Sequence, residues 1–142
     1  MALGEKLWEG KGKTAGPGYI KSITMDGVTS AYTWSAQVKG LGKAKGADGN
    51  IHVTAKGTMP PKGVGSEDDL GTFMTMGGDA GVIKGYGLMK MTMNGKPSAV
   101  SLWCFMTMSE KLAWMNDLIA VVTFEALDPM WTEFNMMIHE WK

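Results

Sequence analysis

The sequence predicts an all-β protein, in which an antiparallel meander closes into a single barrel of eight or nine strands. Three observations predict this fold class. Polar and apolar residues alternate over many short segments, turn-forming pairs separate these segments, and glycines occur within them as well as between them. Glycine supplies 20 of the 142 residues, about twice its usual share of roughly 7%. We favour a closed barrel over a sandwich because closure removes the exposed edges of long strands.

The clearest strand runs from Val28 to Val38, where every second residue belongs to a mainly apolar face. This period of two is typical of a β-strand with one buried face. The segment before it ends at Asp26-Gly27, a pair typical of hairpin turns, and Asn94-Gly95 predicts another hairpin. We expect the other strands at residues 6–13, 19–25, 51–56, 71–76, 82–93, 99–108, 118–125 and 131–141.

Glycines also occur in pairs two residues apart. These pairs are Gly10 and Gly12, Gly40 and Gly42, and Gly85 and Gly87. Each pair places two glycines on one face of a strand, where a barrel bends or two backbones approach closely. We interpret them as barrel corners rather than phosphate-binding loops, because no helix pattern follows Gly87.

Two segments depart from the strand pattern. Residues 60–70 are polar and rich in proline, which predicts one long loop, and a flap over the mouth of the barrel is one interpretation of it. Residues 109–117 begin with Ser109, a good helix cap, and space Leu112 and Met115 three residues apart, which predicts one short helical segment. Neither segment divides the chain, so we expect a single domain over residues 1–142.

The composition excludes several classes of partner. Lys and Arg number 14 and so do Asp and Glu, and the lysines are scattered singly, whereas binding to nucleic acid or to a charged membrane requires a basic excess. The longest apolar stretch, residues 99–106, is too short for a membrane-spanning helix. The first residues lack the apolar core of a signal peptide, and a single cysteine allows no internal disulfide. We therefore expect a cytoplasmic protein with no nucleic-acid and no membrane partner.

The chain is methionine-rich, and several of its 14 methionines alternate along predicted strands. They form the groups Met74 and Met76; Met89, Met91 and Met93; and Met106 and Met108. With the thiolate of Cys104 such thioethers would suit Cu(I), but thioethers alone bind metals weakly. We favour an adaptable core or an apolar pocket lined by flexible side chains, with Cys104 a small buried residue. The sequence predicts no metal and no cofactor.

Acidic residues offer two candidate sites. The cluster Glu67 to Asp69 could hold a hard cation, but it lacks the ligand spacing of a calcium loop, so we interpret it as part of a solvated loop. Glu125 ends an otherwise apolar strand and is the candidate catalytic residue, because desolvation at a pocket mouth would raise its pKa. The alternative for Glu125 is an ordinary charge at a strand end. His52 and His139 fall on polar faces and are expected in solvent.

The predicted function is the binding of a small apolar or planar molecule in the barrel interior. A small barrel holds a ligand when its side chains leave part of the interior unfilled, and aromatic and thioether groups suit such a guest. Two alternatives stay open: an isomerase or cyclase that uses Glu125 as acid or base, and an interaction module that assembles as a homo-oligomer. The candidate ligand-binding residues are Tyr32, Trp34, Met76, Met91, Trp103, Phe105, Phe134 and Met136.

The chain resembles small proteins with an allene oxide cyclase-like or calycin-like β-barrel. The resemblance lies in the short strands punctuated by glycine, in the run Leu112-Ala113-Trp114-Met115-Asn116 before an apolar strand, and in the closing Glu140-Trp141-Lys142. It implies an antiparallel barrel with an apolar cavity, in some cases as a homo-oligomer, and it assigns no catalytic residue. The Gly-x-Trp signature of lipocalins is absent, since Leu7-Trp8-Glu9-Gly10 has the reverse order.

Overall fold

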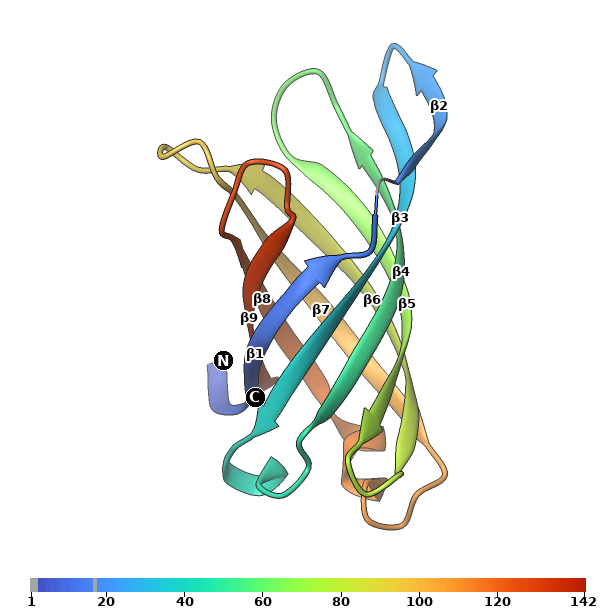
Figure 1. Ribbon diagram of the computed structural model, residues 1–142, viewed down its shortest axis with the longest axis vertical. Helices are drawn as coiled ribbons and strands as arrows, with labels where there is room; N and C mark the ends of the chain where they lie inside the picture. The colour runs from blue at the N-terminus through green and yellow to red at the C-terminus, as the bar shows by residue number, and fades with distance from the viewer. Residues whose placement is uncertain (1–2, 17) are drawn as a thin grey trace.

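The described residues form a closed antiparallel barrel of eight strands with one further strand, as the sequence predicts (Figure 1). The computed structural model describes residues 3–16 and 18–142. The elements in chain order are β1 (Leu3–Thr14), β2 (Tyr19–Thr24), β3 (Gly27–Gly40), the 3₁₀ turn η1 (Gly42–Ala44), β4 (Gly49–Met59), β5 (Gly65–Thr75), β6 (Ala80–Met91), β7 (Pro97–Thr107), the 3₁₀ turn η2 (Ala113–Asp117), β8 (Ile119–Ala126) and β9 (Glu133–Trp141).

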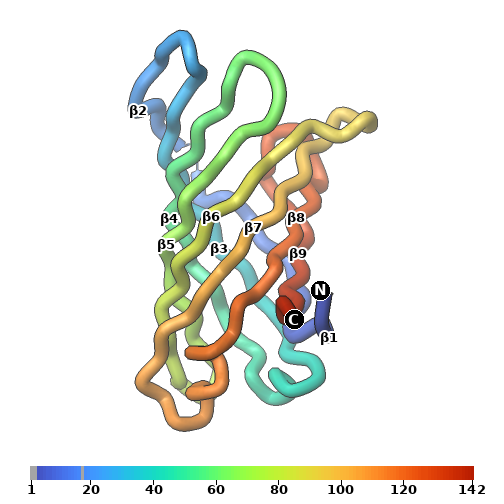
Figure 2. The backbone as a smooth tube through the Cα atoms, turned by 180° about the vertical axis from the view of Figure 1, so that it is seen from behind, coloured from blue at the N-terminus to red at the C-terminus, as the bar shows by residue number. Residues whose placement is uncertain are grey.

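The barrel closes because β1 pairs along both of its edges. The strands follow the order β1-β9-β8-β7-β6-β5-β4-β3, and β1 then pairs with β3 to complete the ring. In this ring Gly10 of β1 lies opposite Val38 of β3 on one side and Met136 of β9 on the other. Strand β2 pairs with the first part of β3 and stands beside the barrel at its upper end (Figure 2).

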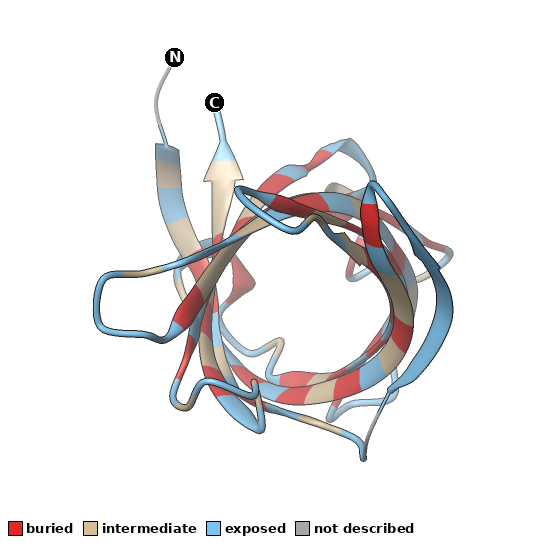
Figure 3. Cartoon of the chain, turned by 90° about the horizontal axis from the view of Figure 1, so that it is seen from above, coloured by how far each residue is buried: buried red, intermediate tan, exposed pale blue. Residues whose placement is uncertain are grey.

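Alternate residues of each barrel strand face the interior, which produces the banded pattern of burial in Figure 3. On β3 the inward residues Trp34, Ala36 and Val38 are buried, in agreement with the predicted apolar face. Large rings fill the middle of the barrel. Trp34 lies 5.9 Å from Trp103 between ring centroids, in a stacked arrangement, and 5.3 Å from Phe134 in an edge-to-face one.

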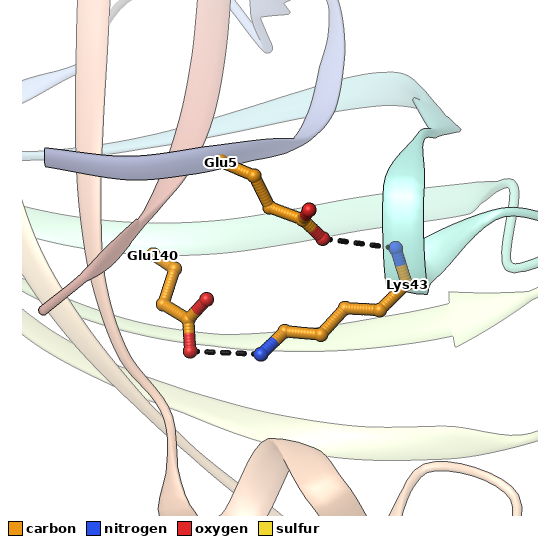
Figure 4. A network of polar contacts seen from close by, with 3 residues as sticks. All are labelled: Glu5, Lys43 and Glu140. Carbon is orange, nitrogen blue, oxygen red and sulfur yellow. Dashed lines mark hydrogen bonds and ion pairs between the residues drawn. The ribbon is translucent and has the colours of Figure 1, made fainter.

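The lower end of the barrel is filled by side chains. Met115 of η2 is buried there, and the Trp114 ring stacks on Trp8 with 5.7 Å between centroids. At this end Lys43 connects η1 with β1 and β9 (Figure 4). Its backbone N–H donates to Glu5 Oε1 at 3.0 Å, and its Nζ donates to Glu140 Oε1 at 2.8 Å. The hydrogen bond and charge of Lys43 hold the pKa of Glu140 below its usual range. Any open space in the interior therefore lies toward the opposite, upper end.

Two predicted segments differ in the structure. The loop expected over residues 60–70 is shorter, because β5 begins at Gly65 and takes the acidic cluster into the barrel wall. The helical segment expected over residues 109–117 is present as the 3₁₀ turn η2. The first difference has a physical cause: the inward face of β5 is polar near its start, so a pattern based on hydrophobicity does not reveal the strand.

We expect Gly10→Ala to weaken the barrel at its closure. A Cβ added at Gly10 would overlap the carbonyl oxygen of Gln37 on β3, and this backbone cannot move without disturbing the β1–β3 pairing. Overpacking of this kind costs about 1–3 kcal/mol, which urea unfolding would measure. The matched control is Gly77→Ala, since a Cβ there has its nearest neighbours at 3.8 Å. Equal stability of the two variants would contradict a tight closure.

Candidate functional site

A cavity of about 440 Å³ occupies the upper end of the barrel. Its floor is formed by Trp34, Phe124 and Phe134, which belong to the aromatic core, and β2 and the loop before β9 supply residues at its rim. Glu67 supplies the only carboxyl group among the described lining residues. The full lining is Thr14, Gly16, Gly18, Tyr19, Ile20, Ser30, Tyr32, Trp34, Glu67, Met89, Ala99, Phe124, Met130, Trp131 and Phe134.

Glu67 reaches the cavity from the inward face of β5 and is only 8% exposed. The hydroxyl of Tyr32 on β3 donates a hydrogen bond to Glu67 Oε2. Burial, with a smaller contribution from the nearby charge of Asp69, raises the pKa of Glu67 to about 7, while the Tyr32 hydrogen bond acts in the opposite direction. A carboxyl group with this pKa exchanges its proton near neutral pH, so the site contains a group able to act as an acid or a base.

Asp69 lies two residues further along β5, on the same face and one step deeper in the barrel. It is 3% exposed, and the indole N–H of Trp103 donates to its Oδ2 at 3.0 Å. Burial raises the pKa of Asp69, and hydrogen bonds from Trp103 and Ser101 oppose that change. The Ser101 hydroxyl of β7 is buried beside Asp69, in a residue that is 1% exposed. The two acids form one buried pair, called here the Glu67–Asp69 pair.

Glycines on the neighbouring strands provide the space that this pair needs. On β6, Gly87 lies opposite Glu67 and Gly85 lies opposite Asp69. A Cβ at Gly85 would overlap the Trp103 ring, and one at Gly87 would overlap the Ser101 hydroxyl. The Gly-x-Gly pair predicted as a barrel corner therefore lets side chains of β7 lie across β6 toward the acids of β5.

The structure brings some of the predicted ligand-binding residues to this cavity and not others. Tyr32, Trp34 and Phe134 line it, whereas Trp103, Phe105 and Met136 are buried in the core below. The expectation that Met76 and Met91 face the interior is wrong, because these side chains are 79% and 61% exposed. Met76 follows β5 on its outward parity, and Met91 is the last residue of β6, at the edge of the barrel.

The structure also corrects the prediction for Glu125. The buried residues of β8 are Ala120, Val122, Phe124 and Ala126, so Glu125 points outward, and its side chain is exposed. It contributes nothing to the cavity. The carboxyl group that lines the cavity is that of Glu67, a residue expected in a solvated loop.

Most of the alternating methionines lie on the outside of the barrel, which corrects their interpretation as core or pocket. The side chains of Met74, Met106 and Met108 are exposed, and Met89 is the member of these groups that lines the cavity. Cys104, expected to be buried, is exposed on the outer face of β7. His52 is exposed, as predicted, and His139 is half-buried. Within residues 3–16 and 18–142, no group of three His, Cys, Asp or Glu residues could hold a metal ion.

The sequence pattern suggests a possible cation site at Glu67 to Asp69 but favours a solvated loop there, and it does not single out Ser101. One signal could have found the acids: they share the parity of Gly65, Gly71 and the buried Phe73, so the alternation of β5 extends upstream through the acidic cluster. This signal is weak in a sequence, because an inward acid looks the same as a solvated one until a neighbour is known to bury it.

The fold and this site define a small closed antiparallel β-barrel with a buried acid pair, and similar barrels are known. A protein with unknown function from Clostridium acetobutylicum ATCC 824 is 14% identical, with a TM-score of 0.81 and coverage of 100% of both chains. A β-barrel-like protein from Acinetobacter baumannii AYE is 15% identical, with a TM-score of 0.82 over 99% of this chain and 96% of that chain. An enzyme from Penicillium herquei is 18% identical, with a TM-score of 0.65 over 98% and 94%.

At these identities the similarities show the fold alone. No family model matches the chain, and no curated protein matches it. The similar structures thus support the β-barrel fold that the resemblance implies. Their descriptions do not mention an allene oxide cyclase-like or calycin-like family. In the part of the chain that the structure describes, none of the helices is long and apolar enough to cross a membrane.

We expect the stability of the protein to fall as the pH rises from about 4.5 to about 7, because the folded state then retains a proton on Glu67 that the unfolded state has lost. The raised pKa of Glu67 corresponds to a loss on the order of 3 kcal/mol, and the raised pKa of Asp69 acts in the same direction. Glu67→Gln should remove most of the fall, while the exposed Glu125→Gln should retain it. Urea unfolding on both sides of this range measures the difference, and parallel pH profiles for all three proteins would contradict the buried position of Glu67.

Proposed function

We propose that the protein binds a small apolar or planar molecule in the cavity at the upper end of the barrel. The observation that carries this proposal is the contrast between the two ends: the lower end is filled by Met115 and Trp114, whereas about 440 Å³ stays open above Trp34. This volume lies within the range of about 300–1,000 Å³ typical of small-molecule sites.

The lining suits such a guest in chemistry as well as in size. Aromatic rings form the floor, Met89 and Met130 add flexible thioethers, and Ala99 leaves room on the β7 side. Glu67 and Tyr32 provide the polar groups that would orient one end of the molecule. A mainly apolar wall with few convergent polar groups is the usual composition of a ligand site.

A large side chain placed in the cavity should weaken ligand binding. We expect the neutral probe N-phenylnaphthylamine to fluoresce on binding to the protein, and Ala99→Phe, which places a ring in the cavity, to weaken binding by about tenfold or more. The control is Val100→Phe, which changes the next residue on the outer face of the same strand and should bind as the unmodified protein does. If the probe does not bind, or if both variants bind it equally, the cavity is not its site.

A second candidate function is proton transfer of the isomerase or cyclase type, with Glu67 in the role first expected of Glu125. Its specific support is the pKa of about 7 of Glu67, which is buried next to the Tyr32 hydroxyl. In such a reaction the Glu67 carboxylate takes a proton from one atom of the substrate and returns it to another, so no co-reactant is needed. The similar structure described as an enzyme is compatible with this candidate.

A generic carbon acid tests this second candidate. In nitrobenzisoxazole, a base removes the proton from carbon, the N–O bond breaks, and a nitrile and a phenolate form. We expect the protein to accelerate this ring opening with a rate that rises through pH 7, and Glu67→Gln to lower it by about a hundredfold or more. Glu125→Gln is the control. Equal rates for the Glu67→Gln and unmodified proteins would rule out Glu67 as a base within reach of a bound molecule.

A further inference from the structure

The upper half of the barrel interior holds two buried acidic side chains without any positive partner. The described residues form two ion pairs, Lys6 with Glu9 and Lys43 with Glu140, and neither involves the Glu67–Asp69 pair. The described residues that line the cavity include no Lys, Arg or His. A carboxylate buried in this way is unfavourable unless a cation or several hydrogen-bond donors compensate it.

The donors that reach the pair are few and neutral. Tyr32 gives one hydrogen bond to Glu67, and Trp103 gives one to Asp69. The Ser101 hydroxyl, in a residue that is 1% exposed, is a further neutral group beside Asp69. Of these acids and their donors, Glu67 and Tyr32 line the cavity, so a bound molecule can contact the Glu67 carboxyl group. The protein therefore supplies the acid pair with neutral donors and with no cation.

The walls around Glu67 are suited to a cation. Trp34, Trp131 and Tyr32 line the same cavity, and the faces of such rings attract positively charged nitrogen. Trp131 is also the only described residue other than glycine with a positive φ, at 58°. Thr14 Oγ1 donates to its carbonyl oxygen at 2.7 Å, so this costly conformation is fixed at the rim of the cavity.

We propose that the ligand is an organic cation, with a protonated nitrogen that donates to Glu67 and an apolar or planar body that lies against Trp34, Trp131 and Phe134. This inference rests on the proposed function of ligand binding and adds the charge of the ligand to it. A cation would supply the missing positive charge and a charged donor to Glu67. An anionic ligand would meet the opposite conditions, because it would add a second negative charge beside the acid pair.

The test uses three probes with the same planar body and different charge: naphthylmethylamine, naphthylmethanol and naphthoate. We expect isothermal titration calorimetry near neutral pH to show that the ammonium binds about tenfold or more tightly than the alcohol, and that the carboxylate binds most weakly. Glu67→Gln keeps the size of the side chain and removes its charge, and it should bring the ammonium and the alcohol to similar affinity. Glu125→Gln, on the outer face, should preserve the preference for the ammonium.

The outcomes separate this inference from the proposed function. Equal binding of the alcohol and the ammonium by the unmodified protein would overturn the cationic ligand but leave an apolar binding site. The same holds if Glu67→Gln keeps the preference for the ammonium. If none of the three probes binds, both the inference and the proposed function are overturned. The comparison of the three probes on the unmodified protein does not depend on the folding of any variant.

Discussion

The pairing of β1 with β3 is the constraint on which the rest of the structure depends. Strand β1 also pairs with β9, the last strand of the chain. The pairing of β1 with β3 therefore joins the two ends of the row of strands and closes it into a ring. In a closed ring each side chain faces either the interior or the outside, and the number of strands limits the interior volume. A large inward side chain must then lie beside a small one, and the glycines of this chain supply the small positions.

The burial of the Glu67–Asp69 pair depends on this placement of large side chains beside small ones. Trp103 lies over Gly85, Ser101 lies over Gly87, and the Tyr32 hydroxyl lies close to Gly57. Glycines therefore lie on both sides of Glu67 and on the β6 side of Asp69, and the side chains that reach the acids come from one strand further away. These side chains are a phenol, an indole and a hydroxyl, so the acids are enclosed without being neutralised by a basic group.

The sequence predicts a strand well where the interior is apolar and the exterior polar. Residues 34–38 meet this condition, and their inward face agrees with the prediction, whereas nearer the start of β3 Val28 is exposed and Ala31, on the other face, is buried. On β5 the condition is reversed, since Glu67 and Asp69 face inward while Leu70 is 61% exposed. Met74 and Met106 also lie outside the barrel, and here the inward neighbours Phe73 and Phe105 are apolar as well. Alternation reveals that a strand has two faces, but hydrophobicity assigns the faces correctly only when the interior is the more apolar of the two.

The difference between Glu67 and Glu125 shows what decides a carboxyl group's chemistry. Glu67 faces the interior and Glu125 faces the solvent, and burial raises the pKa of Glu67. The aromatic core below Glu67 is continuous with the floor of the cavity through Trp34 and Trp103. Asp69, which does not line the cavity, raises the pKa of Glu67 from this core. The deep packing of the barrel therefore influences the chemistry of the cavity through Glu67, the one carboxyl group among its described lining residues.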